Sequence, residues 1–180
     1  MDMGNEEQQI NRDTSVNIQP IAIRFGLIAS FVSILSSLML YFFNLEYNGF
    51  WKWLPTILIL AIIIITQKQV VQLNAPYQFS FGELFKFGFV IALISAIALL
   101  LYFILYSNFI MPDFIDKIME VSRKQLEEKG MSEEQIESAL EMSKKFMSPT
   151  LMMVMSFISS LIMGSLTALI GAGIFKNKKQ

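Results

Sequence analysis

Four long stretches of this sequence are almost free of charged residues, and they constrain the fold more than any other feature. They cover residues 21–43, 53–73, 84–106 and 150–175. A helix of about 20 apolar residues is long enough to cross the ~30 Å hydrocarbon core of a bilayer. A lone strand would leave its backbone hydrogen bonds unsatisfied in lipid, so helices are expected. The sequence therefore predicts an all-α membrane protein with four transmembrane helices, embedded in the lipid bilayer. The second stretch is the shortest, and it spans the core only if Lys52 reaches outward and the helix continues to Leu73.

The composition of the chain excludes several classes of function. Charged residues make up 16% of the 180 residues, against about 25% in an average soluble domain. Histidine and cysteine are both absent, which removes the commonest general base, the thiol nucleophile and the main zinc ligands. The net charge of −1 does not favour nucleic-acid binding. We therefore expect no catalytic residues, no cofactor, no metal and no nucleic-acid partner, and we consider an enzyme acting on lipid only as a third possibility.

A polar segment between the third and fourth stretches has the pattern of two amphipathic helices. Residues 112–147 carry apolar residues on one helical face and charged residues on the other. Gly130 ends the first helix, and Ser132 with Gln135 forms a capping box that opens the second. Spacings of four residues predict ion pairs such as Asp113 with Lys117 and Glu120 with Lys124. We expect an extramembrane antiparallel helical hairpin that stands on the membrane.

Cap residues mark where two of the long helices begin. Ser80 and Glu83 form a capping box before the third, and Ser148 precedes Pro149 at the start of the fourth. Glu83 and Lys86 are candidate interface charges. For Glu83 we prefer the capping role to a carboxylate in an inner vestibule. Both residues lie within one turn of an interface, and no ionisable residue lies deep in a predicted span, which disfavours a proton-coupled or ion-coupled transporter.

Small residues recur at spacings of three or four in the predicted spans. Such stripes let helices approach closely in lipid. The candidate packing residues are Gly26, Ser30 and Ser33 in the first span, Gly88 and Ala92 in the third, and Ser160, Gly164 and Ala168 in the fourth. They serve either packing within the chain or an oligomer interface, and the former is the more common use. The first and third spans also match at a constant offset, as in Arg24–Gly26 and Lys86–Gly88, which fits a duplication or chance equally well.

Lysine and arginine placement predicts the orientation of the chain. The counts on the two sides are equal, but one set lies on short flanks, where the positive-inside bias is strongest. That set includes the basic C-terminal tail, residues 176–180. We therefore expect both termini in the cytoplasm, with residues 1–20 as a disordered cytoplasmic tail that is not a secretory signal. The aromatic residues expected at the outer interface are Tyr41, Tyr47, Trp51, Trp53, Tyr102 and Tyr106.

Two further clusters could in principle bind metals. Asp113, Asp116 and Glu120 share a face that could bind calcium, but lysines on the same face favour a solvated, salt-bridged surface. The methionines at 152, 153 and 155 could ligate copper(I), but lipid-facing filler is the preferred interpretation.

Several short motifs in order along the chain resemble a known family. They are the residues 79–88 (FSFGELFKFG), 112–114 (PDF), 130–137 (GMSEEQIE) and 146–149 (FMSP). Together they resemble domain-of-unknown-function family 4199, small four-helix inner-membrane proteins common in Bacteroidota. The resemblance implies a bacterial cytoplasmic membrane location and supplies no activity.

Taken together, these features predict a non-enzymatic interaction or assembly component. Its hairpin, or its small-residue stripes, would bind a protein partner or a second copy of the chain. The alternative is an oligomeric channel or transporter-like protein for a small solute. Its candidate pore-lining hydroxyl residues are Ser33, Ser37, Ser95, Ser159 and Thr167.

Overall fold

The computed structural model describes residues 17–45, 47, 49–75, 77–146 and 148–176. The predicted tails fall mostly outside these residues, as does Met147 at the end of the predicted hairpin. All regular elements in the described part of the chain are helical. They are α2 (Gln19–Phe42), the 3₁₀ turn η1 (Trp51–Trp53), α3 (Leu54–Leu73), α4 (Phe81–Leu105), the π-helical turn η2 (Tyr106–Ile110), α5 (Phe114–Glu128), α6 (Glu133–Phe146) and α7 (Pro149–Phe175).

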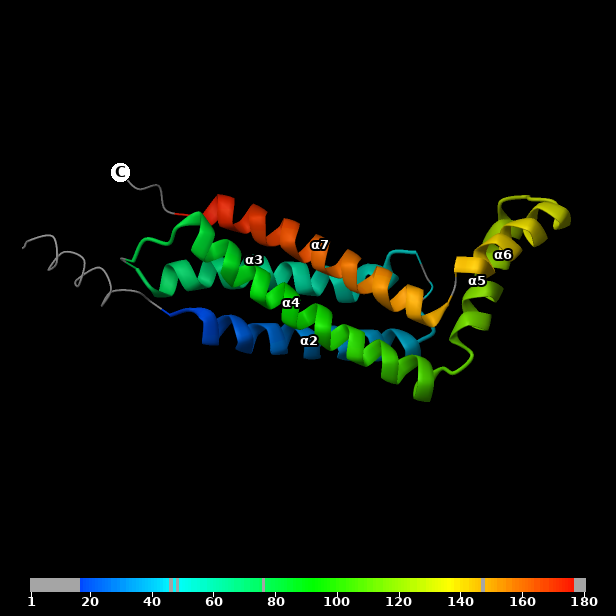
Figure 1. The fold of residues 1–180 in the computed structure, drawn as a ribbon, viewed down its shortest axis with the longest axis horizontal. Helices are drawn as coiled ribbons and strands as arrows, with labels where there is room; N and C mark the ends of the chain where they lie inside the picture. The colour runs from blue at the N-terminus through cyan, green and yellow to red at the C-terminus, as the bar shows by residue number, and fades with distance from the viewer. Residues whose placement is uncertain (1–16, 46, 48, 76, 147, 177–180) are drawn as a thin grey trace, which may run out of the picture.

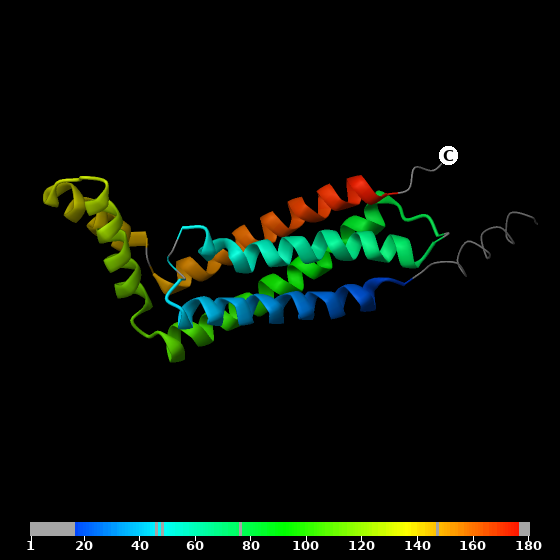
Figure 2. The same ribbon diagram turned by 180° about the vertical axis from the view of Figure 1, so that it is seen from behind.

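Four of these helical segments are long and apolar enough to cross a membrane. They are α2, the Trp51–Leu73 segment, the Phe81–Ile110 segment and α7. The four run side by side and alternate in direction, so that the start of α2 and the end of α7 lie at the same end (Figure 1). The shorter helices α5 and α6 extend beyond the opposite end (Figure 2). Within the described residues, the prediction of an all-helical fold with four long apolar helices is confirmed.

Local sequence chemistry explains where the long helices begin. Proline occupies the first turn of α2, α3 and α7, where its missing N–H costs no helical hydrogen bond. The predicted capping box of α4 is confirmed, because the Ser80 side chain accepts from Glu83 N–H while the Glu83 carboxylate accepts from Ser80 N–H. Ser148 caps α7 by accepting from Leu151 N–H, as predicted.

The third long helix continues further than the sequence predicted. Helical structure extends through η2 to Ile110, whereas the predicted span ended at residue 106. Ser107 and Asn108 donate side-chain hydrogen bonds to the carbonyls of Phe103 and Ile104, which satisfies acceptors at the helix end. Pro112 then follows, and a proline disfavours helical backbone at the residue before it; Met111 accordingly has φ of −137° and ψ of 78°.

The long helices bury small and polar residues alongside large apolar ones and also expose many large apolar side chains. Small and polar residues such as Ala22, Ser33 and Ser95 are buried between the long helices. Large apolar residues point outward, including Phe31 at 63% and Ile170 at 60% exposure. A water-soluble protein rarely exposes so many large apolar side chains together, so the outward faces of these helices suit an apolar surrounding.

The helices α5 and α6 contact each other across the short turn that joins them. Gly130 in that turn has φ of +75°, the left-handed conformation that glycine adopts without strain. Met119 of α5 and Ile136 of α6 are buried, and Arg123 forms an ion pair with Glu133 across the pair. The predicted Ser132–Gln135 capping box is confirmed by reciprocal hydrogen bonds.

The ion pairs on α5 differ from the predicted ones in one respect. Glu120 pairs with Lys124, as predicted, and also with Lys117. Lys117 was expected to pair with Asp113. In the helix, the i+3 carboxylate of Glu120 accepts from Lys117 at 3.3 Å and gathers both ammonium groups on one side.

Candidate interaction site

The predicted small-residue stripes of α4 and α7 face each other. A Cβ atom added to Gly164 would lie 2.5 Å from the Ala92 Cβ, and one added to Gly88 would lie 2.7 Å from the Ala168 Cβ. Such distances are shorter than any normal non-bonded carbon–carbon contact. The absence of a side chain at the two glycines therefore allows the helix backbones to approach closely. Ser160 lies one turn before Gly164 in α7, is only half-buried, and lines a small cavity together with Ala96. Gly88, Ala92, Gly164 and Ala168 are therefore used in packing within the chain.

The small residues of α2 contact α3 and α4. A Cβ atom on Gly26 would lie 2.9 Å from the Ile94 Cβ. The Gly26 carbonyl accepts hydrogen bonds from Ser30 in the same helix and from Ser95 of α4. Ser33 donates to the Pro55 carbonyl at the start of α3, at 3.0 Å. These serine hydroxyls therefore hydrogen-bond to backbone carbonyls, either in a neighbouring helix or in their own helix.

Gln67 lies at the point where α3, α4 and α7 meet, and the sequence interpretation missed it. Its side chain is fully buried, and its amide Nε2 donates to the carbonyls of Leu84 and Ala168 at 3.0 and 2.9 Å. Its Oε1 faces Gly171, where a Cβ atom would overlap it. Among the described residues, no donor forms a conventional hydrogen bond to that oxygen. A glycine Cα–H can offer it a weak hydrogen bond.

The two predicted interface charges occupy different environments. Glu83 accepts hydrogen bonds from the Tyr77 hydroxyl and from the N–H and hydroxyl of Ser80, each at 2.7 Å. The hydrogen bond to Glu83 raises the pKa of Tyr77, with partial burial and the negative charge adding to the shift. Lys86 is exposed one turn further along α4. The contacts of Glu83 match the capping role rather than a vestibule carboxylate.

A groove of about 550 Å³ runs between α5 and α6. Met119 and Leu140 are the apolar residues of its described lining, and charged side chains surround them. Those charged residues are Glu120, Arg123, Glu137, Glu141 and Lys144. Three carboxylates against two cations leave the rim slightly acidic. We refer to this feature as the α5–α6 groove.

Several charges around the α5–α6 groove are already paired within the chain. Hydrogen bonds from Lys124 and Lys117 lower the pKa of Glu120, and the pKa of Lys124 is raised in return. The hydrogen bond to Glu133 raises the pKa of Arg123. Within the described residues, Glu141 and Lys144 take part in no ion pair. On the α6 side of the groove, the charged groups of Glu141 and Lys144 can therefore form ion pairs with a partner.

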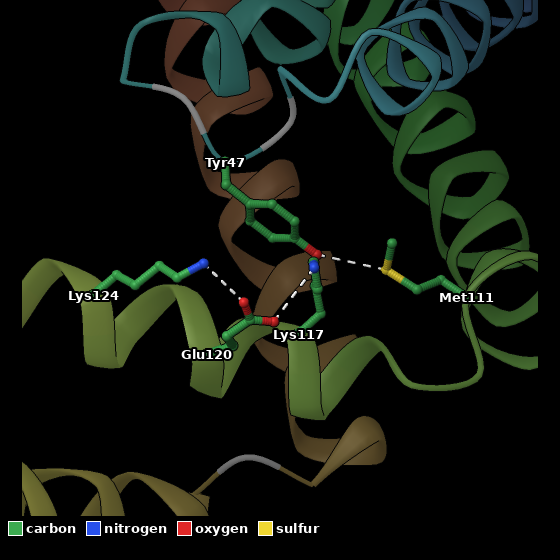
Figure 3. A network of polar contacts seen from close by, with 5 residues as sticks. All are labelled: Tyr47, Met111, Lys117, Glu120 and Lys124. Carbon is green, nitrogen blue, oxygen red and sulfur yellow. Dashed lines mark hydrogen bonds and ion pairs between the residues drawn. The ribbon is translucent and has the colours of Figure 1, made fainter.

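A tyrosine connects the α2–α3 loop with the base of α5. The Tyr47 hydroxyl lies 3.6 Å from the Met111 sulfur, beside the Lys117–Glu120–Lys124 cluster (Figure 3). Tyr47, Met111 and Lys117 line a common cavity at this junction. The α2–α3 loop and the segment that leads into α5 therefore meet here, although they lie far apart in the sequence.

The structure does not gather the candidate pore hydroxyls around one common cavity in the described part of the chain. Ser33 and Ser95 donate to helix carbonyls, and Thr167 donates to the Met163 carbonyl of its own helix. Ser37 and Ser159 line two separate cavities. No group of three or more potential metal-ligating acidic residues was found among the described residues.

Comparison with known proteins identifies a family for this chain. The model of a family described as "Protein of unknown function (DUF4199)" matches residues 24–177. This confirms the resemblance inferred from the short motifs. No curated protein and no solved structure matches the chain.

Proposed function

The chain belongs to the DUF4199 family of proteins of unknown function, and we propose that it is an integral membrane protein whose α5–α6 pair binds a protein partner outside the bilayer. In this proposal the four long helices cross the bacterial cytoplasmic membrane and both termini are cytoplasmic. The α5–α6 pair forms an extracytoplasmic hairpin. No catalysis is involved.

The exposed apolar surface of the long helices supports the membrane part of the proposal. Large side chains such as Phe31, Leu101 and Ile170 are more than half exposed on separate helices. Monomeric soluble proteins rarely expose apolar patches of more than a few hundred Å². A lipid environment accepts such a surface, while the small and polar residues inside provide the close helix contacts that hold a membrane protein together.

The observation that carries the interaction role is the α5–α6 groove with its apolar lining and unpaired charge. Leu140 is only half-buried, and Glu141 next to it forms no ion pair among the described residues. Gly88 and Gly164, in contrast, are already covered by helices of the same chain. The groove is therefore a better candidate than the small-residue stripes for binding a second molecule. Its acidic rim favours a partner that presents an apolar side chain flanked by basic ones.

Site-specific cross-linking in intact membranes tests this proposal. A benzophenone amino acid at Leu140 should cross-link one other protein of defined mass. The same residue at Ser138, which is exposed on α6 but outside the groove lining, serves as the matched control and should not. Equal cross-linking from both positions, no product from Leu140, or a product with the mass of two copies of this chain would each contradict a groove-bound protein partner.

Charge reversal then tests the acidic rim. The double substitution Glu137→Lys and Glu141→Lys should abolish the cross-link from Leu140 because it reverses the charge on the α6 side of the groove. Glu134→Lys lies on the same helix outside the groove lining and should leave the cross-link intact. Far-UV circular dichroism of both purified variants checks that α6 remains folded.

The alternative of an oligomeric channel has less support from the geometry. Its candidate hydroxyls at Ser33, Ser95 and Thr167 donate to backbone carbonyls rather than projecting into a shared space. Solute flux through reconstituted vesicles would favour the channel over the interaction role.

A further inference from the structure

A separate cavity of about 200 Å³ lies at the joint between the long helices and α5. Its lining includes Tyr102 and Phe103 of α4, Tyr106 of η2 and Phe114 of α5. Tyr47 from the α2–α3 loop and Lys52 of η1 also line it. The cavity is smaller than the ~300–1,000 Å³ typical for a whole drug-sized ligand, so it accommodates one end of a larger molecule.

The chemistry of the cavity is amphipathic with one positive charge. Aromatic rings and Leu40 supply apolar walls, and tyrosine hydroxyls supply polar groups. Lys52 is its one charged lining residue in the described part of the chain, and no carboxylate lines it there. The Lys52 ammonium lies 5.8 Å from the Trp53 ring centroid and forms no ion pair among the described residues. A ligand with a negatively charged end and an apolar remainder matches this lining.

The position of the cavity narrows the choice of ligand. Trp51 and Trp53 are about half exposed beside Lys52, and tryptophan is enriched at the depth of lipid headgroups. The exposed apolar side chains of α2 and α4 continue from this end along the helices. At that depth, the abundant molecule with an anionic end and an apolar remainder is a phospholipid.

We propose that this cavity binds the anionic headgroup of a membrane phospholipid. The Lys52 ammonium would contact the phosphate, and the first part of the lipid would lie against Leu40 and Phe103. The inference rests on the membrane placement proposed above, but it does not depend on a protein partner for the α5–α6 groove.

Binding at this position would also connect lipid to the orientation of α5. Phe114 lines the cavity and packs edge-on against Phe103 and Tyr106, with ring centroids 5.3 and 5.9 Å apart. A bound lipid would therefore contact α4 and α5 at once. The amide protons at the start of α5 should exchange more slowly when the anionic lipid is bound.

Native mass spectrometry of the full-length protein in detergent tests the proposal. The protein is incubated with phosphatidylglycerol or with phosphatidylcholine of the same acyl chains, and the lipid adducts are counted. Phosphatidylglycerol should be retained preferentially, and Lys52→Gln should reduce its retention by roughly tenfold, the typical effect of losing one charged contact. Lys68→Gln is the matched control because Lys68 is exposed on the same segment at its other end.

A second variant tests whether the lipid occupies the cavity itself, independently of the charge of Lys52. Ser37→Phe adds bulk to the lining without changing the charge, and it should reduce phosphatidylglycerol retention to the same extent. Equal retention of the two lipids, or equal effects of Lys52→Gln and Lys68→Gln, would overturn the proposal. Displacement of the lipid by millimolar inorganic phosphate would instead identify a site for free phosphate and would also overturn it. If the membrane placement itself were wrong, the chain would stay soluble without detergent, which is a separate measurement.

Discussion

At the scale of single residues, the side chain of Gln67 joins α3 to two other helices. It is a fully buried amide that contacts α4 and α7 through Leu84 and Ala168. A buried polar group is costly unless it is hydrogen-bonded, and leaving a partner unsatisfied costs about 1–3 kcal/mol. The two hydrogen bonds to these carbonyls therefore fix the position of α3 relative to α4 and α7. Gly171 is required beside it because Gln67 Oε1 occupies the place of a side chain there.

The first prediction concerns Gly171. Gly171→Ala should destabilise the protein by about 1–3 kcal/mol, as overpacking of a filled interior does. Gly173→Ala, on the same helix with nothing near its Cβ position, should be neutral or slightly stabilising because alanine is the better helix former. Thermal unfolding in detergent, followed by circular dichroism, measures both.

A double substitution shows whether Gln67 is the cause. In a Gln67→Ala background, the added cost of Gly171→Ala should fall sharply because the overlapping oxygen is gone. The Ile64 Cδ1 atom, 3.1 Å from the same Cβ position, is the end of a flexible side chain and can move aside. Additive effects of the two substitutions would refute this account of the contact.

At the scale of helices, the close contact between α4 and α7 depends on the absence of side chains at two glycines. Gly88 and Gly164 lie at successive contacts with Ala168 and Ala92. The sequence identified all four residues as candidates for packing, because their spacing puts them on one face of each helix. The pairing itself depends on the register of the two helices, which no local pattern specifies.

The second prediction tests that pairing by moving a methyl group across the contact. Gly164→Ala alone should destabilise the protein by about 1–3 kcal/mol, since the new Cβ would lie 2.5 Å from that of Ala92. Adding Ala92→Gly should restore most of the lost stability because it removes the opposing methyl group. Ala96→Gly, one turn further on the same helix, is the control and should give no rescue. Unfolding curves of the wild-type protein and the three variants, all measured in detergent, make the comparison.

At the scale of the whole molecule, the arrangement places both described chain ends together and α5 and α6 at the other end (Figures 1 and 2). An even number of membrane crossings would put the two termini on one side of the bilayer and the α5–α6 pair on the other. The basic residues flanking the terminal end favour the cytoplasm for that side.

The third prediction is a labelling pattern. Single cysteines replacing Ser138 and Asn177 should react with an impermeant maleimide from opposite sides of sealed membrane vesicles. The wild-type chain contains no cysteine and therefore supplies an unlabelled background. Labelling of both positions from the same side would contradict the four-crossing arrangement.

The sequence by itself determined that this chain forms long apolar helices and which residues cap α4, α6 and α7. Those properties are local: the length of an uncharged run and the side chains within one turn of a helix end are enough to specify them. The Ser80–Glu83, Ser132–Gln135 and Ser148 caps all followed from neighbouring residues.

Only the tertiary structure decided which side chains are buried between the long helices and which groups they contact there. In the polar run at residues 66–69, Thr66 and Gln67 turn inward, whereas Lys68 and Gln69 remain exposed. All four residues lie near the end of a predicted span, so the sequence alone offered no reason to place an amide in the interior. The burial of Gln67 depends on carbonyls 17 and 101 residues away along the chain. Such acceptors come within reach only after the helices have packed.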